Sequence, residues 1–554
     1  MKNLNKSNKY IEILKNKKML YAHWRAENKE DGPYHNYYLP LKEIFDNIVV
    51  FDPAKNYFNH GKKKMNEMLI ELVKKEKPDY ILFGLIYDEF YLETFKTIKQ
   101  ISPKTITINL FGDDDWRFWD FTRYYALFFD YYIITQDGYS LYKKDGIKNV
   151  SVFGTGVNCE YLKPLNLEKI YDISFYGRAN QNRADYIKYL GDNKINIKVF
   201  GDGWAKYPEL DKYNLGHLST EDLVKLINQS KINLGLSAGG YGKLQLKAKP
   251  FEASACKSFA LIEYFEGYLD FFNNNTEIIM FKDKKDLIKK INYYLKNEKE
   301  MNKIIENGYK RVYKDHNNKT KYLNLFKEIL KKGPLPKNIP KSSERVLNIQ
   351  KEEIFKGLEN LKQKLKGRDY ILISNNNSKI SPYKEDLQIY SLEKSKKDIS
   401  CCDYYIHSPH LSNYLLFKAS LAFNKLDNLN FHKLIIPTQL MFKKDYFINN
   451  FDNIINFISK NNFNLITKDN TVFVSIPLLE TNKVKVLNYN IMKDAFQMKF
   501  LDKLYSLHHE KRLIFNHYPY RLIIKSIIGQ SFILKAIYAT IKDSDKLNKA
   551  LKGY

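Results

Sequence analysis

Short runs of β-branched and aromatic residues alternate with amphipathic helical patterns over the first 155 residues. The expected strands are 19–24, 47–53, 79–86, 104–112, 131–136 and 149–154. Strand–helix alternation at this spacing predicts a parallel, doubly wound α/β sheet. Residues 1–156 are therefore expected to form a first Rossmann-like domain.

The same alternation restarts after residue 157. The expected strands are 171–177, 195–203, 231–239, 258–265 and 276–281, and the expected helices are 181–191, 220–229, 247–256 and 284–314. Ser219 or Thr220 is the expected N-cap of the second of these helices. Residues 157–332 are thus expected to form a second Rossmann-like domain that faces the first across a cleft.

A proline-rich stretch marks the next boundary. Pro334, Pro336 and Pro340 lie close together, which stiffens the backbone and disfavours regular structure. Residues 333–343 are expected to be a linker, and residues 344–554 an accessory α/β domain. Its expected elements are a charged helix at 351–366, strands at 370–374 and 471–477, helices near 445–460 and a basic, partly apolar helix at 521–552.

Size and composition narrow the class of protein. A chain of 554 residues with 44% hydrophobic residues is expected to fold into two or three globular domains. The N-terminus is polar and lysine-rich, and no stretch approaches the ~18 apolar residues of a spanning helix, so a cytoplasmic location is expected. Four cysteines are too few for a disulfide scaffold, and reduced thiols are expected.

The net charge of +27 favours anionic partners without selecting one. Nucleic acid, an anionic membrane surface and phosphate-bearing ligands all fit its sign, and a lysine-rich composition explains it equally well. No nucleic-acid motif is visible, so nucleic acid is not an expected partner.

The most specific patterns lie in four segments. They are PKTITINLFGDDDW, DISFYGRANQNRADYIKYL, VFGDGW and KLQLKAKPFEASACKSFALIEYF, and a fifth run from Thr276 to His316 follows them. In this order, over about residues 20–330, the chain resembles the CgeB-like family of GT-B glycosyltransferases. The resemblance implies a two-Rossmann-domain GT-B fold.

It also implies an activity. The expected enzyme transfers a sugar from a UDP-, GDP-, CDP- or dTDP-sugar to a hydroxyl of a glycan, lipid-linked or protein acceptor. No obligatory metal or other cofactor is implied, and cell-surface polysaccharide or glycan biosynthesis is the expected setting. The donor would lie against the second domain.

The resemblance also assigns donor-site residues. Glu252 of PFEASA would bind the ribose, because a carboxylate accepts from two vicinal hydroxyls at once. Cations or helix N-termini must hold the diphosphate, and Arg178, Arg183 and Lys249 are expected there. The alternatives are a helix-capping Glu252 and basic residues that are solvated surface charges.

Three further residues follow strands of the second domain. Gly177 ends its first strand, while Gly201 and Trp204 belong to FGDGW. Small residues there would let the donor approach, and the indole could pack near the base, although Trp204 could equally be core. The glycines of GTGVNC at 154–159 favour a hinge over a cofactor-binding loop.

One departure leaves the stereochemistry open. The acidic residue expected eight positions before Glu252 in the wider retaining GT-B pattern is Leu244 here. The sequence therefore implies neither retention nor inversion.

Candidate bases for the acceptor hydroxyl lie in the first domain. Asp113 and Asp114 follow a strand at the carboxyl edge of the expected sheet, as does His23. Helix N-capping for the aspartates and a satisfied buried imidazole for His23 are the structural alternatives.

The last third faintly resembles a degenerate GT-A domain. Asn375, Asn376 and Asn377 stand where an Asp cluster would bind metal, and neutral amides are poor ligands for a hard cation. Residues 521–540 could contact the anionic inner face of the membrane or pack internally. Two other classes remain open: a non-catalytic sugar-nucleotide or glycan-binding protein, and a basic nucleic-acid-binding protein.

Overall fold

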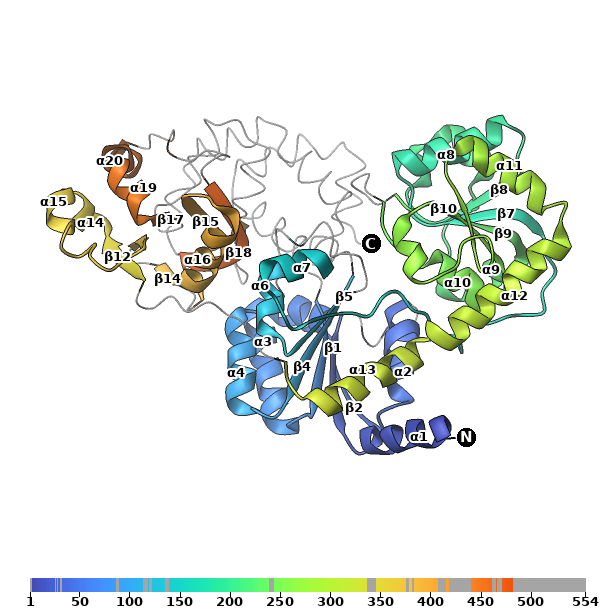
Figure 1. Ribbon diagram of the computed structural model, residues 1–554, viewed down its shortest axis with the longest axis horizontal. Coiled ribbons are helices and arrows are strands. Elements are labelled where there is room, and N and C mark those ends of the chain that lie inside the picture. The colour runs from blue at the N-terminus through green and yellow to red at the C-terminus, as the bar shows by residue number, and fades with distance from the viewer. Residues whose placement is uncertain are drawn as a thin grey trace.

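A computed structural model of the chain contains three β-sheets with their helices (Figure 1). It describes residues 2–24, 26, 28–29, 32–85, 89–112, 118, 122–134, 139–238, 244–335, 345–374, 378–380, 383–406, 415–417, 440–460, 465 and 471–481. The predictions for Asp113, Asp114, Asn375–Asn377 and the 521–552 tail fall outside these residues.

The first sheet is parallel, as expected. Its order is β2 (Asn47–Phe51), β1 (Lys18–His23), β3 (Tyr80–Gly84), β4 (Ile106–Phe111), β5 (Tyr131–Ile134) and β6 (Val150–Val152). Its helical segments are α1 (Lys2–Lys15), the π-helix η1 (Tyr34–Tyr38), α2 (Leu39–Lys42), α3 (Pro53–Glu76), α4 (Leu92–Ile101), α6 (Arg123–Tyr125), η3 (Ala126–Phe128) and α7 (Tyr139–Asp145). Helices on both faces explain why strands such as β3 are apolar throughout.

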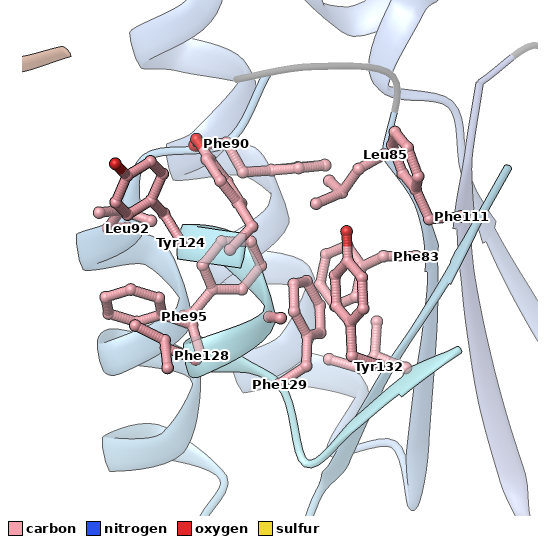
Figure 2. Close-up of a cluster of buried hydrophobic side chains, with 14 of the residues drawn as sticks. Phe83, Leu85, Phe90, Leu92, Phe95, Phe111, Tyr124, Phe128, Phe129 and Tyr132 are labelled. Atoms are coloured by element: carbon pink, nitrogen blue, oxygen red, sulfur yellow. The ribbon is translucent and has the colours of Figure 1, made fainter. Parts of the chain in front are cut away.

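Aromatic side chains form much of the core between this sheet and α4. Figure 2 shows Phe83 of β3 facing Phe90, Phe95 and Phe129. The ring centroids lie 5.3, 5.5 and 5.4 Å from that of Phe83, in edge-to-face geometry. Such pairs add to the free energy gained from burial alone.

The second sheet is also parallel. Its order is β11 (Ile279–Phe281), β10 (Phe259–Glu263), β9 (Ser230–Gly235), β7 (Tyr171–Tyr176) and β8 (Ile197–Phe200). Its helices are α8 (Gln181–Asp192), η4 (Trp204–Lys206), η5 (Pro208–Tyr213), α9 (Thr220–Gln229), α10 (Lys249–Ala255), η6 (Glu266–Asp270), α11 (Lys284–Tyr294) and α12 (Glu298–Asp315). Of the two residues expected as the N-cap of α9, Ser219 and Thr220, the structure shows Ser219, which accepts from the Asp222 N–H at 3.1 Å.

The helix expected at 284–314 is wrong in one respect. Two helices, α11 and α12, occupy this stretch. The chain leaves helical geometry at Asn297, whose φ of −116° and ψ of 60° interrupt the backbone ladder.

Helix α13 (Asn318–Lys332) returns to the first sheet, although the sequence placed it in the second domain (Figure 1). Phe326 packs edge-to-face on Phe45 and Tyr80, at 4.9 and 5.2 Å between centroids. The chain passes between the two units twice, near Val157 and near His316. These two segments lie side by side, since the Val157 N–H donates to the His316 carbonyl at 3.0 Å. The apolar face of α13 thus completes the core of the first unit.

The third sheet mixes parallel and antiparallel strands. Its order is β12 (Val346–Gln350), β13 (Tyr370–Ser374), β17 (Leu440–Lys443), β15 (Ile399–Ile406), β18 (Thr471–Thr481) and β14 (Ser378–Ile380), and β16 (Leu415–Phe417) pairs with β15. Its helices are α14 (Lys351–Ile354), α15 (Leu358–Leu361), α16 (Lys384–Ser395), α19 (Lys444–Asn449) and α20 (Phe451–Lys460). The single helix expected at 351–366 is wrong, because Gly357, at a φ of 92°, separates α14 from α15.

The third unit packs directly on the first through α16, which lies beside α6 and α7 (Figure 1). Leu387 and Tyr390 of α16 belong to the same buried cluster as the aromatic core of the first sheet. The Tyr390 hydroxyl donates to Asp145 at 2.5 Å, and the buried Arg123 guanidinium lies 3.5 Å from that carboxylate. The third unit is therefore continuous with the first unit's core.

No helix within the described ranges is long and apolar enough to cross a membrane. All four cysteines are buried, and none forms a disulfide.

Candidate functional site

Helices α8 and α10 each bring one cation to Gly177, the residue that follows β7. Lys249, the first residue of α10, donates from Nζ to the Tyr176 carbonyl and lies 3.7 Å from the centroid of the Tyr176 ring. A Cβ built on Gly177 would lie 3.5 Å from Lys249 Nζ and 3.4 Å from Nη1 of Arg183. The end of β7 is therefore flanked by an ammonium and a guanidinium group.

Arg183 is held in place by the loop that precedes it. Asn180 caps α8 and accepts from the Arg183 N–H at 2.9 Å, while Arg183 Nη1 donates to the Arg178 carbonyl at 2.6 Å. The guanidinium also lies 5.6 Å from the centroid of Phe175. Arg178 thus orients Arg183 through its backbone, and its own Cγ lies 3.8 Å from a Cβ built on Gly203.

Glu252 lies one turn after Lys249 on α10, so both side chains emerge on one face of the helix. Its Oε2 accepts from the Tyr176 hydroxyl at 2.8 Å. Burial, and then the neighbouring Glu252 carboxylate, raise the pKa of Tyr176 well above its usual value, so this phenol remains a donor.

Lys249 carries the most perturbed charge of the cluster. Its pKa is lowered to about 7, chiefly by burial; Glu252 acts in the opposite direction, and Arg183 and Lys247 act with burial. An ammonium group crowded by other cations gains from a bound anion that neutralises them. The cluster is therefore suited to an anionic ligand with hydroxyl groups near Glu252.

The predicted glycines allow two loops to approach each other. Gly177 and Gly201 have φ values of 145° and 124°, and a Cβ on Gly201 would lie 2.6 Å from the Gly177 carbonyl oxygen. The loops are joined by a hydrogen bond from the Ala179 N–H to the Asp202 carbonyl at 2.9 Å. The close neighbour of Gly201 is thus the backbone of the loop after β7.

Trp204 lies in the core, which is the second of the two alternatives that the sequence left open. Its side chain is 1% exposed and lies edge-on to Phe175, with ring centroids 5.9 Å apart. Its Nε1 donates to the Gly177 carbonyl at 3.0 Å. Trp204 therefore packs in the core and holds the loop of Gly177 through this hydrogen bond.

In the first unit, His23 ends β1 and packs over Gly84, where a Cβ would lie 2.0 Å from its Cδ2. Its Nδ1 lies 3.0 Å from the Trp24 carbonyl, which assigns the proton to Nδ1 and leaves Nε2 unprotonated. Burial lowers the pKa of His23, and the Trp24 carbonyl and Asp52 only partly oppose this. With its pKa lowered and its proton on Nδ1, the imidazole is neutral near pH 7.

The carboxyl edge of the first sheet contacts the second unit through aromatic rings. His35 of η1 stacks on Tyr161, with centroids 4.1 Å apart and planes at 19°. The Tyr161 hydroxyl donates to the Thr220 carbonyl at the start of α9, and burial and then Glu252 raise the pKa of Tyr161. Segment η1, which follows β1 in the chain, therefore contacts the second unit near the start of α9.

Sequence reasoning missed two residues of this region, Tyr176 and Glu263. Each is a polar residue at the carboxyl end of a parallel strand, and for Glu263, the last residue of the otherwise apolar β10, that pattern could have identified it. Tyr176 contacts Glu252, and Glu263 accepts from the Ser237 N–H at 2.7 Å.

Within the described ranges, no three His, Cys, Asp or Glu side chains gather as a metal site would require. Residues 183–327, which include Arg183, Lys249 and Glu252, match the model of a family described as glycosyl transferase-like. This match confirms the predicted glycosyltransferase resemblance for that part of the chain. No curated protein matches the chain significantly.

Several solved structures are similar to part of the chain. Sucrose-phosphate synthase from Thermosynechococcus elongatus is 11% identical, with a TM-score of 0.42, and the match covers 57% of this chain and 99% of that one. A glycosyltransferase from Rickettsia africae is 16% identical, with a TM-score of 0.41 and coverage of 57% and 100%. Anabaena HepE, solved with UDP and glucose, is 12% identical, with a TM-score of 0.43 and the same coverage. The predicted class of two parallel α/β units followed by an accessory unit agrees with the sheet topology.

Proposed function

We propose that this chain, in which residues 183–327 match the glycosyl transferase-like family, transfers a sugar from a nucleoside-diphosphate sugar to an acceptor hydroxyl. The acceptor is a glycan, a lipid-linked molecule or a protein. The observation that carries the proposal is the gathering of Lys249, Arg183 and Glu252 around the end of β7.

The donor's diphosphate would lie between Lys249 and Arg183. Both groups are already fixed, Lys249 on the Tyr176 carbonyl and Arg183 on the Arg178 carbonyl, so little side-chain ordering is needed on binding. They neutralise charge in the bound donor and more of it as the diphosphate leaves. Glu252 would accept from the ribose hydroxyls with the oxygen that Tyr176 does not occupy.

His23 would accept the proton of the acceptor hydroxyl. In the transfer, the acceptor oxygen bonds to the anomeric carbon, the bond from that carbon to the diphosphate oxygen breaks, and the proton moves to Nε2 of His23. Its neutral, Nδ1-protonated form has the lone pair that this step requires. Asp113 and Asp114 remain alternative bases.

The reaction would take place in the cytoplasm, as a step of cell-surface polysaccharide or glycan biosynthesis. The net charge of +27 supports a peripheral contact with the anionic inner face of a membrane, with residues 521–540 as the contacting segment. Vesicles containing anionic phospholipid should then retain the protein, and a chain truncated after residue 520 should be retained less.

A thermal-shift screen against UDP-, GDP-, CDP- and dTDP-sugars tests the donor site. A ligand at ~100 times its dissociation constant stabilises the folded state by ~2.7 kcal/mol, so one nucleotide should raise the melting temperature clearly. Glu252→Ala should lose this shift. The matched control Glu298→Ala, at an exposed position of α12, should keep it.

Two outcomes would count against the proposal. If no nucleotide sugar shifts the folded wild-type protein, or if Glu298→Ala loses the shift as fully as Glu252→Ala, the donor site is wrong. A donor that binds but is never transferred to glycan, lipid-linked or protein acceptors would support the non-catalytic binding protein instead.

A further inference from the structure

A buried carboxylate lies at the carboxyl end of β10, next to β9 in the second sheet (Figure 1). Glu263 is 8% exposed. Its Oε2 accepts from the backbone N–H groups of Ser237 and Ala238, at 2.7 and 3.3 Å, and its Oε1 accepts from the Tyr186 hydroxyl at 3.2 Å. The Ser237 hydroxyl donates in turn to the Glu263 carbonyl at 2.8 Å.

Hydrogen bonds from neutral N–H and O–H groups stabilise the negative charge of Glu263. In the described part of the chain, N–H and O–H groups surround its carboxylate, and it takes part in no ion pair. Burying an ionised carboxylate is costly, whereas a glutamine could accept hydrogen bonds at this position without that cost. What the charge adds is a stronger hydrogen bond to the chain it holds, above all the one of 2.7 Å from the Ser237 N–H.

That chain is the connection from β9 to α10. Ala238 forms an antiparallel bridge with Leu244, and the Gln245 N–H donates to the Ser237 carbonyl at 2.9 Å. The returning segment continues through Lys247, whose N–H donates to the Tyr268 hydroxyl at 3.0 Å, into Lys249 at the start of α10. Glu263 therefore holds residues 237–238, which pair with residues 244–245 shortly before helix α10 begins at Lys249.

We propose that Glu263 is a positioning residue of the donor site. Its carboxylate holds residues 236–238, and through them residues 244–247, so that Lys249 enters α10 facing the end of β7. Glu263 acts through Lys249 and does not touch the donor. This inference rests on the proposed function, since it assumes that Lys249 binds the diphosphate.

The test compares Glu263→Gln with Glu266→Gln, a matched charge removal at an exposed position three residues later. Hydrogen–deuterium exchange should become faster in residues 236–247 of Glu263→Gln, with unchanged exchange in the first sheet. Affinity for the tightest of UDP, GDP, CDP and dTDP should fall about tenfold, the order expected for weakening one charge-assisted hydrogen bond network. In turnover assays the KM for the donor should rise and kcat should fall with it, because Lys249 also neutralises the leaving diphosphate, whereas Glu266→Gln should change neither.

A second variant covers the case in which Glu263→Gln does not fold. Tyr186→Phe removes one donor to the carboxylate and keeps both N–H bonds, so it should produce the same changes at a smaller size. In either variant, unchanged exchange at 236–247 would overturn the proposal. So would an affinity loss of equal size in Glu266→Gln.

The exchange measurement separates this inference from the proposed function. Weaker nucleotide binding without faster exchange would mean that Glu263 touches the donor, which overturns the positioning role. If the wild-type protein binds none of the four nucleotides, the proposed function fails. Hydrogen–deuterium exchange alone then decides whether Glu263 holds the connection from β9 to α10.

Discussion

The pKa of Lys249 makes nucleotide binding depend on pH. Burial is the main cause that lowers this pKa from its ordinary 10.5 to about 7, with Arg183 and Lys247 acting in the same direction and Glu252 against them. Only the ammonium form attracts a diphosphate, and a bound diphosphate raises the pKa again. We therefore expect affinity for a nucleoside diphosphate to fall as the pH rises above about 7.

The size of the effect follows from the protonated fraction. With a pKa of about 7, about half of the Lys249 groups are protonated at pH ~7 and about one in a hundred at pH ~9, so affinity should fall across this range by at most roughly 50-fold, the limit reached when the neutral amine does not bind. This equals about 2.3 kcal/mol. The terminal phosphate loses its last proton near pH ~6, so its own charge contributes little to the change.

Isothermal titration calorimetry of the wild type, Lys249→Arg and Lys249→Met would measure this dependence. Arginine stays charged throughout the range, so Lys249→Arg should bind with little pH dependence. Lys249→Met should bind weakly at every pH. A wild-type affinity that stays constant within about twofold between pH ~7 and pH ~9 would refute the argument, because a lysine of ordinary pKa would give that result.

The unliganded protein should show the opposite trend in stability. The folded-state pKa of Lys249 is lowered, so between about pH 7 and pH 10.5 the unfolded chain binds the proton and the folded chain does not. The contribution of Lys249 to the free energy of unfolding therefore rises with pH in this window. Urea denaturation should show a slope in the wild type that is reduced in Lys249→Met.

Three further predictions concern other parts of the chain. His23→Gln should lower kcat by ~10²–10⁴-fold and leave nucleotide affinity unchanged in calorimetry, and an unchanged kcat would remove His23 as the base. Gly201→Ala places a Cβ 2.6 Å from the Gly177 carbonyl oxygen at a φ of 124°; it should lower the melting temperature and weaken nucleotide binding, and equal values for both proteins would contradict this role of the glycine. Tyr390→Phe deletes a buried hydrogen bond to Asp145 and should lower the free energy of unfolding in urea by about 1–3 kcal/mol, whereas no loss would mean that the contact adds nothing.

Local pattern was sufficient for most elements of the first two sheets. Their strands are buried apolar runs flanked by helices, and period and composition suffice to identify such runs. The Ser219 cap was predictable because a cap depends on residues three positions apart. The breaks at Asn297 and Gly357 were missed because a helical pattern can continue across a residue whose backbone leaves the helix.

The donor-site residues were predictable to different degrees. The sequence placed Lys249, Glu252, Arg183 and Gly177 at one candidate site, and the structure brings them together at the end of β7, while donor binding by them stays a prediction. The sequence left two positions open for Trp204, because a tryptophan after a strand can point to a ligand or into the core, and packing places it in the core. The pKa of Lys249 is likewise a property of its burial, which no spacing reveals.

What the sequence determined by itself is what neighbours along the chain decide: strand and helix order, the α/β class and the motif carrying Lys249 and Glu252. The tertiary structure decided which distant segments meet. Helix α13 returns to the first sheet, α16 buries Tyr390 against Asp145, and Glu263 holds Ser237. These contacts join residues far apart in the sequence, and they form because apolar faces and buried polar groups must find partners wherever the fold supplies them.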